Sequence, residues 1–439
     1  MKSQTISALI VLAILILFSA SATAQCPATK YGLNPVWPVN WTQTDRQNWY
    51  LDMAVHGQGF QSDGRTWRQL QVMMDSSTLV PFRDEIIWAK TNGGIEKYLF
   101  QLKNPISVNN QMPPVWCGNP LTDTNTTNAL YSFTTAFLDT MHQVLDYFVL
   151  GSETDIYFKS GPAERDSFFV MAQRISDYID LHYPEIRFGI GVSMFCALNP
   201  DNHYWNMVLT RGDIMSVSWW PLDSYYMADT SEINSADSVI SVLLAKCGSK
   251  PVVISDCGVT TAMAPERDDI QSEFVRNTFL YTMNVPQIEA VGYYYLADFD
   301  TTAIYYQQNL YMTYAPEFYQ SIKSRGLLDS LGNPKPSFDV YISMLDTVCA
   351  FVGNDEQQLN SEISIWPNPA SEKLFVNGNG FSFYRIYATS GQLMAQGLLN
   401  KNGSPEIDIA RLADGAYILY LISEKKSPEN ILFIKERQP

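Results

Sequence analysis

Short, almost wholly apolar runs alternate with longer amphipathic stretches over residues 30–350. Each run is typical of a strand buried on both faces, as in a parallel sheet. In the stretch 128–145, Leu130, Phe133, Phe137 and Met141 recur at steps of three or four residues, which gives a helix one apolar face. The runs predict strands over 31–35, 57–61, 97–102, 147–150, 186–192, 214–219, 252–254 and 291–295; the amphipathic stretches predict helices over 128–145, 163–182, 235–247 and 268–283.

This strand–helix alternation, repeated about eight times, predicts the α/β class and a (β/α)8 TIM barrel over residues 25–350. A doubly wound open sheet is the alternative. It has less support, because the sequence contains no Gly-rich phosphate loop of the GxGxxG or P-loop type.

The pattern changes after Cys349. The polar, acidic segment "GNDEQQLNS" indicates a linker over 351–361. From residue 362 to 439, short alternating strands separated by turn residues predict a second, all-β domain, a small sandwich of about seven strands or fewer.

The first 24 residues are typical of a secretory signal peptide. Lys2 precedes an apolar run from Ala8 to Phe18, and the small residues Ala22-Thr23-Ala24 mark a cleavage site. The run is too short for a membrane anchor, and no later stretch is long and apolar enough to span a bilayer. We therefore expect an exported protein in which the six cysteines form one or two disulfides.

The composition limits the kinds of partner that the protein is expected to bind. The formal net charge is −16, from 45 acidic and 29 basic residues, which argues against a nucleic acid or an anionic membrane. The four histidines and the cysteine spacings match no zinc pattern, so we expect no metal and no cofactor. The 10 Trp, 25 Tyr and 22 Phe residues supply core, and also the flat faces that carbohydrate-active proteins place against sugar rings.

Two of the apolar runs end on a carboxylate. Glu153 follows the fourth predicted strand in "VLGSETDIYF", and Asp256 follows the seventh in "KPVVISDCGVTT". Strands four and seven end on opposite sides of a barrel mouth, and paired carboxylates across a cleft suit glycosidic bond cleavage. A helix cap or a turn is the alternative for any acid at a strand end, and it is our interpretation of Asp155.

Several segments together resemble the clan A glycoside hydrolases. "VLGSETDIYF" is similar to their GNE signature, particularly as it occurs in barrels related to the family 53 endo-galactanases. "MSVSWWPLD", "KPVVISDCGVTT", "QSEFVRNTF", "GYYYLADFD" and "GLLDSLGNPKPSF" follow in the order of that family and extend the resemblance over residues 30–347. The resemblance implies an O-glycoside hydrolase in which Glu153 is the acid/base and Asp256 stands at the nucleophile position.

Three positions depart from the clan A pattern. Ser152 replaces the asparagine that holds the 2-hydroxyl of the substrate, Trp220 replaces a tyrosine, and Asp256 replaces a glutamate. The shorter side chain withdraws the carboxylate by roughly 1.5 Å. This leaves three hypotheses: hydrolysis of β-linked polysaccharide with Asp256 as nucleophile or as base for a water, a non-catalytic glycan-binding pseudoenzyme, and a purely structural barrel.

The resemblance also suggests residues that bind substrate or brace the site. Arg65 and Arg68 follow the second strand, where clan A barrels carry an arginine beside the nucleophile; exposed turn arginines are the alternative. Trp219 and Trp220 are candidates to stack on a sugar ring or to fill the core. Residues at the end of the eighth strand are expected to line the cleft, namely Tyr294, Tyr295 and Asp298.

The last segment closely resembles the C-terminal sorting domain of the type IX secretion system. "WPNPASEKLFV" matches its opening, "YRIYATSGQLM" its middle, and "LADGAYILYLI" with "FIKE" its end, over residues 363–436. A carbohydrate-binding module is the alternative for a small β-sandwich. The resemblance implies that the type IX machinery is a partner and that the protein is secreted or held at the outer cell surface.

Overall fold

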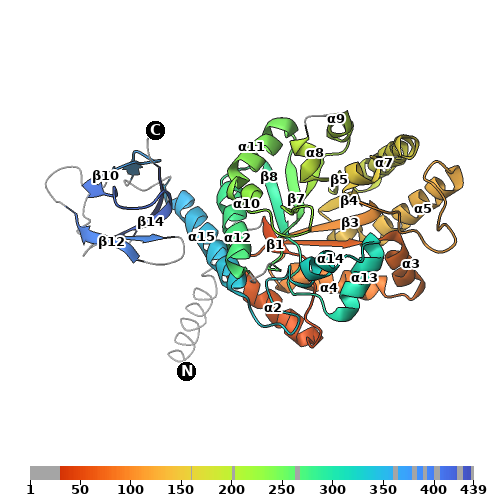
Figure 1. The fold of residues 1–439 in the computed structure, drawn as a ribbon, viewed down its shortest axis with the longest axis horizontal. Coiled ribbons are helices and arrows are strands. Elements are labelled where there is room, and N and C mark those ends of the chain that lie inside the picture. The colour runs from red at the N-terminus through yellow and green to blue at the C-terminus, as the bar shows by residue number, and fades with distance from the viewer. Residues whose placement is uncertain are drawn as a thin grey trace, which may run out of the picture. The chain divides into compact units, whose positions relative to one another are not determined.

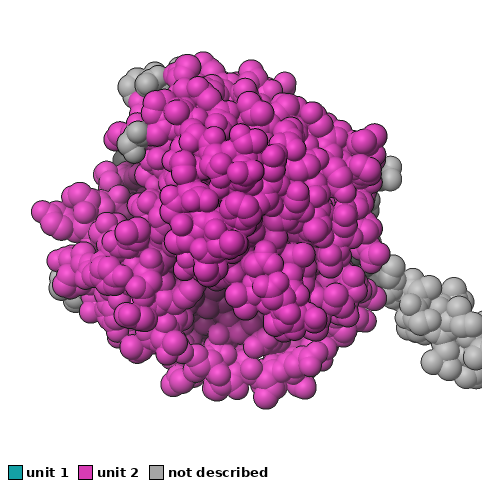
Figure 2. Space-filling model, turned by 90° about the vertical axis from the view of Figure 1, so that its right-hand side faces the viewer, with its two compact units in different colours: residues 1–27, 348–439 teal, residues 28–347 magenta. Residues whose placement is uncertain are grey.

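The structure is a computed structural model of the chain. It describes residues 30–159, 161–199, 203–262, 267–358, 364–377, 383–388, 393–399, 406–422 and 429–436. The predicted signal peptide lies outside these ranges. The chain divides into two compact units, and residues 28–347 form the larger one (Figure 2).

The larger unit is the predicted parallel barrel (Figure 1). Its strands pair in sequence order, and β1 closes the ring by pairing in parallel with β8. The strands are β1 (Tyr31–Leu33), β2 (Phe60–Arg65), β3 (Lys97–Ile106), β4 (Tyr147–Ser152), β5 (Arg187–Ser193), β6 (Ile214–Trp219), β7 (Val252–Cys257) and β8 (Ile288–Tyr293).

Helices lie between and after the strands. The four predicted helices correspond to α5, α7, α11 and α12, and α5 begins earlier than expected because Asp123 caps its first backbone amides. The helices are α2 (Gln43–Val55), α3 (Trp67–Asp75), α4 (Leu79–Asn92), α5 (Thr124–Met141), α6 (Thr154–Tyr157), α7 (Pro162–His182), α8 (Met194–Leu198), α9 (His203–Leu209), α10 (Thr230–Asn234), α11 (Ala236–Cys247), α12 (Asp268–Thr282), α13 (Thr301–Tyr311), α14 (Pro316–Lys323) and α15 (Pro336–Gln358).

Helix α15 occupies part of the segment expected to be a linker. It continues through Gln358, so residues 351–358 are helical, and 359–361 lie outside the described residues. Glutamate and glutamine are good helix formers, and no proline interrupts the segment, so its polarity alone does not end the helix.

The barrel interior is layered. A fully buried apolar layer fills the part of the barrel nearer the amino ends of the strands. It consists of Phe60, Leu99, Tyr147, Val149, Ile214, Val253 and Ala290. Side chains two residues further along a strand point to the same face. Leu99 is therefore followed inside the barrel by Gln101 and then Lys103, and Ile214 by Ser216 and then Ser218. The interior becomes polar towards the carboxyl ends of the strands.

The smaller unit contains two antiparallel sheets, ordered β13-β10-β9 and β12-β11-β14-β15. A core of buried side chains, including Leu374, Val376, Ile386, Leu419 and Phe433, belongs to this unit. Its strands are β9 (Ser364–Trp366), β10 (Lys373–Asn377), β11 (Phe383–Ala388), β12 (Leu393–Leu398), β13 (Glu406–Asp408), β14 (Gly415–Ile422) and β15 (Glu429–Lys435).

Two further expectations concern cysteines and membranes. Cys349 is disulfide-bonded, whereas Cys247 and Cys257 are buried thiols of the barrel unit.

None of the helices in the described ranges combines the length and the hydropathy that a membrane span requires.

Candidate active site

Glu153 stands at the end of β4 in an unusual backbone conformation. Its φ and ψ of 51° and 44° are left-handed, and the short helix α6 starts at the next residue. The side chain is half-buried, and Glu153 Oε1 accepts a hydrogen bond of 3.1 Å from Ser218 Oγ of β6. Backbone strain of this kind is typical of functional sites.

The surroundings of Glu153 favour its protonated form. Burial raises the pKa of the Glu153 carboxyl, and the nearby charge of Asp155 adds to this effect. Hydrogen bonds from Ser218 and Ser107 and the charge of Lys103 act in the opposite direction but do not cancel it. A carboxyl with a raised pKa can serve as a general acid.

Asp256 lies on β7 opposite Ser218 of the neighbouring strand β6. Ser218 therefore links the two carboxyl residues, since it donates to Glu153 and pairs with Asp256. Only 4% of Asp256 is exposed to solvent. Its Oδ2 lies 3.3 Å from Nζ of Lys103, which is equally buried and also donates a hydrogen bond of 2.9 Å to the Tyr294 hydroxyl.

Lys103 acts on the charge of Asp256. Burial raises the pKa of the Asp256 carboxyl, and the Lys103 ammonium opposes that rise without cancelling it. Burial would also lower the pKa of Lys103, but Asp256 and the tyrosines Tyr311 and Tyr295 outweigh burial and raise it. Lys103 therefore remains an ammonium, and its contact favours the ionised form of Asp256.

Gly64 makes room for this lysine. A Cβ atom at position 64 would lie 2.3 Å from Cε of Lys103, well inside van der Waals contact. A larger residue at this position of the neighbouring strand β2 would therefore have to displace the Lys103 side chain from its contact with Asp256.

Aromatic residues and one arginine surround Lys103 and Asp256. The rings of Trp220 and Tyr294 meet edge to face at 5.3 Å, and Tyr295 packs on Tyr294 with a positive φ of 73°. The guanidinium of Arg325 lies 4.8 Å from the centre of the Trp220 ring. These groups belong to the segments that directly follow β8, β6 and α14.

The structure does not bring the two predicted arginines to Asp256. The guanidinium of Arg65 lies over the Phe82 ring, and its Nη2 is 3.6 Å from Oδ2 of Asp63. Arg68 donates to the carbonyl oxygen of Met112 in the loop after β3. Lys103, which the sequence reasoning missed, takes the place at Asp256 that those arginines were expected to occupy.

Three other predicted residues also have contacts away from the two carboxylates. Trp219 is fully buried against Phe274 and donates its Nε1–H to Glu232. Asp298 forms an ion pair of 2.7 Å with Lys335 and accepts a hydrogen bond from the Gly326 amide. Ser152 is buried and pairs with Ile106 of β3.

Asp155, interpreted from the sequence as a cap acid, lies inside α6 and contacts the next strand. Its carboxylate accepts hydrogen bonds from the backbone amide and the hydroxyl of Ser193, at 2.8 and 2.6 Å. It therefore holds the end of β5 and the start of α8.

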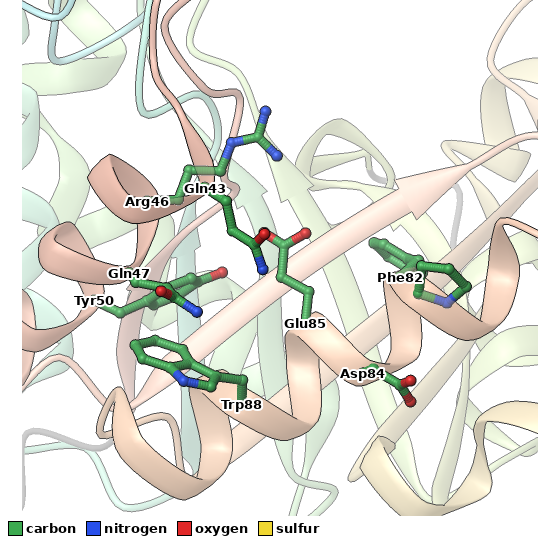
Figure 3. A pocket seen from close by; sticks show the side chains of 9 residues that line it. Gln43, Arg46, Gln47, Tyr50, Phe82, Asp84, Glu85 and Trp88 are labelled. Carbon is green, nitrogen blue, oxygen red and sulfur yellow. The ribbon is translucent and has the colours of Figure 1, made fainter.

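A cavity of about 600 Å³ lies elsewhere on the barrel, between α2 and α4 (Figure 3). Trp88 and Glu85 of α4 face Tyr50, Gln47 and Gln43 of α2 across it (Figure 3). Neither Glu153 nor Asp256 lines this cavity. Within the described ranges, no group of three or more His, Cys, Asp or Glu side chains could hold a metal ion.

Comparisons with known proteins agree with both units. Residues 364–435 match the family described as "Secretion system C-terminal sorting domain". This segment of the smaller unit thus matches the kind of sorting domain that the sequence resembles. No curated protein matches the chain.

Solved structures resemble the barrel. A GH5_18 protein from Streptomyces cattleya in complex with GlcNAc has a TM-score of 0.56 and 15% identity, covering 73% of this chain and 80% of its own. A GH5_18 protein from Bifidobacterium longum subsp. longum in complex with Manβ1-4GlcNAc has a TM-score of 0.55 and 17% identity, covering 72% and 78%. An exo-β-1,4-mannosidase from Opitutaceae bacterium strain TAV5 has a TM-score of 0.54 and 13% identity, covering 72% and 59%.

The barrel thus has the fold of clan A glycoside hydrolases, here represented by family 5. The chain thus combines a barrel of this fold with a C-terminal segment, residues 364–435, that matches a secretion sorting domain. The nearer likeness to family 53 stays a prediction.

Proposed function

We propose that this protein hydrolyses β-linked glycans, with Glu153 as acid/base and Asp256 as nucleophile or water-activating base. The observation that carries the proposal is the unequal environment of the two carboxyls. Burial raises the pKa of both carboxyls, but Asp256 is in direct contact with the Lys103 ammonium, which favours its ionised form, whereas Glu153 accepts its hydrogen bond from a neutral hydroxyl. Such a division separates an acid from a base or nucleophile.

The chemistry follows from these roles. Glu153 donates its proton to the glycosidic oxygen as the bond to the anomeric carbon breaks. Asp256 either attacks that carbon, forming a glycosyl ester that water later hydrolyses, or removes a proton from a water that attacks it. Carboxyl groups about 5–5.5 Å apart favour the first route and about 6.5–9.5 Å the second.

The solved neighbours suggest which substrates to try first. One is named an exo-β-1,4-mannosidase, and another is bound to Manβ1-4GlcNAc. We therefore place β-mannosides and Manβ1-4GlcNAc in the substrate panel beside β-galactans, β-glucans and xylans.

A second candidate function is glycan binding without hydrolysis. It is favoured by the burial of Asp256, of which 4% is exposed, and by its side chain being one methylene shorter than glutamate. A misplacement of about 1 Å can cost on the order of 100-fold in rate. In this case the aromatic residues Trp220 and Tyr294 would hold a sugar that is not cleaved.

One experiment separates these functions. Release of reducing ends is measured with the full chain on the panel, beside Glu153→Gln and the exposed control Glu185→Gln. Release that is lost in Glu153→Gln and kept in the control supports hydrolysis. Binding of a glycan without release by any variant supports the second candidate, and neither release nor binding contradicts both.

The sorting domain bears on localisation. We propose that the type IX machinery recognises residues 364–435 and that the barrel is released from the cell or held at its outer surface. In a host with this machinery, removal of the segment after Gln358 should leave the barrel inside the outer membrane. Export of the shortened chain would contradict this proposal.

A further inference from the structure

Arg325 is a buried cation without a carboxylate partner. Its residue is 6% exposed, and its Nη2 donates a hydrogen bond of 2.9 Å to the Ser321 hydroxyl. Its Nε is buried and has no hydrogen-bond partner. Among the residues that the structure describes, no Asp or Glu lies within ion-pair distance of its guanidinium.

The backbone around Arg325 is firmly held. Its carbonyl oxygen accepts hydrogen bonds from Gln271 and from the Tyr293 hydroxyl, and the next amide, that of Gly326, donates to Asp298. The Trp220 ring then supports the guanidinium at 4.8 Å. The arginine is therefore fixed in place before any ligand binds, which lowers the entropic cost of using it in recognition.

Arg325 belongs to the surroundings of the two carboxylates. Its guanidinium lies 4.8 Å from the centre of the Trp220 ring, and that ring meets the Tyr294 ring edge to face at 5.3 Å. The Tyr294 hydroxyl in turn accepts a hydrogen bond from Lys103, the partner of Asp256. Arg325 thus stands at the same end of the barrel as the proposed site.

The charges of the site do not balance. Lys103 is matched by Asp256, with which it forms the buried ion pair. When Glu153 carries its proton, Arg325 is one positive charge in excess. An unpaired buried charge is costly, and an anion brought by the ligand would remove that cost.

We propose that Arg325 binds a negatively charged substituent of the sugar, so that the site takes an acidic glycan. The planar guanidinium can donate two parallel hydrogen bonds to a carboxylate or a sulfate group. A uronic acid and a sulfated sugar share this chemistry. The inference rests on the proposed function in one respect, since it assumes that a sugar enters this end of the barrel.

The protein's own charge influences the choice of probe. A net charge of −16 repels an acidic polymer at a distance, whereas the contact with buried Arg325 acts at short range and is screened less by salt. Small ligands in about 0.15 M salt are therefore suitable. Methyl β-glucuronide, methyl β-glucoside and the 6-sulfate of methyl β-glucoside differ only in the group at carbon 6.

Calorimetry with the full-length Glu153→Gln protein, which cannot consume the ligand by the proposed route, measures the three affinities. We expect an anionic sugar to bind about tenfold or more tightly than the glucoside. Preference for the glucuronide indicates a uronic acid, and preference for the sulfate ester a sulfated sugar. Equal affinities for all three ligands, or binding of the glucoside alone, would overturn the inference.

Variants of Arg325 assign the effect to this residue. Adding Arg325→Gln should remove the preference for the anionic sugar. Arg325→Lys should keep part of that preference, since the positive charge stays but the planar pair of parallel donors is lost. The exposed Arg411→Gln is the matched control. If the Arg325→Gln protein does not fold, the Arg325→Lys protein provides the test. An undiminished preference for the anionic sugar in Arg325→Lys would contradict recognition by the guanidinium.

Failure of this inference differs from failure of the proposed function. Selective binding of an anionic sugar by a protein that hydrolyses nothing would contradict hydrolysis and leave the role of Arg325 intact. Hydrolysis of neutral glycans without any preference for charged sugars would support the proposed hydrolysis and contradict the role of Arg325.

Discussion

Lys103 and Asp256 form an ion pair of 3.3 Å in which the two side chains are only 5% and 6% exposed. Removing both charges from water costs several kcal/mol, and replacing such a pair by apolar residues often stabilises a protein by about 1–4 kcal/mol. Stability is therefore a poor explanation for the pair. Control of the charge on Asp256 explains it better.

Replacing Lys103 by methionine should destabilise the barrel by about 3–5 kcal/mol, because the Asp256 carboxylate is left buried and unpaired. The double variant Lys103→Met with Asp256→Leu should regain much of this loss. Unfolding in urea measures both. If the double variant loses the sum of the single losses, the two side chains do not interact as the structure indicates.

Gly64→Ala should weaken the function without unfolding the protein. The new Cβ would lie 2.3 Å from Lys103 Cε and must move the lysine away from Asp256. We expect a loss of about 1–3 kcal/mol in stability and a larger relative loss of hydrolysis. In Gly161→Ala, where the nearest atom to the new Cβ is 3.9 Å away, hydrolysis should be unchanged and stability should fall only by about 1 kcal/mol or less, because alanine is a poorer N-cap for α7. Unchanged hydrolysis in a folded Gly64→Ala protein would show that the position of Lys103 does not matter.

The adjacent tryptophans should behave differently. Trp219→Ala should cost about 3–5 kcal/mol in unfolding free energy and leave glycan affinity unchanged in the protein that remains folded, because the ring fills the core against Phe274. Trp220→Ala should weaken glycan binding about fivefold to tenfold, since this half-buried ring contacts Tyr294 and Arg325. Paired urea titrations and calorimetry test both, and the reverse pattern would assign the sugar contact to Trp219.

Asp298 should make stability depend on pH between about 4 and 7. Burial raises its pKa to about 6, and the Lys335 ammonium only partly opposes this. The folded-state pKa lies above the unfolded value of about 3.9, so the stabilising contribution of Asp298 is fully present below pH 4 and is lost as the pH rises through 6.

The comparison with Asp298→Asn isolates this effect. Relative to that variant, the natural protein should lose on the order of 3 kcal/mol of unfolding free energy between pH 4 and 7. The exposed Asp52→Asn serves as the control. A difference between natural protein and Asp298→Asn that does not change with pH would mean that Asp298 has an ordinary pKa.

The sequence predicted the barrel well because its strands are buried on both faces and appear as apolar runs. It was less accurate where strands carry the polar residues of the mouth. β2 was expected over 57–61 but covers Phe60–Arg65, and β3 was expected to stop at residue 102 but continues to Ile106. Polar side chains such as Ser62 and Lys103 interrupt the apolar run at the carboxyl end of each strand.

This limit explains why Lys103 was missed. The available signal was its spacing from Leu99 and Gln101, which places all three on one face of the strand. Conversely, Arg65 and Trp219 lie near the expected strand ends, but their side chains contact Phe82 and Phe274. A likeness to family motifs indicates the strand end and not the direction of each side chain.

The left-handed backbone at Glu153 makes this glutamate costly to the fold. Glycine and asparagine adopt these angles readily, whereas other residues give up roughly 1–2 kcal/mol. Selection for folding alone would thus favour the loss of this glutamate, and a single codon change towards glycine would give a more stable barrel without an acid. Folding alone therefore gives no reason for a glutamate at this position, whereas a use of its carboxyl group does.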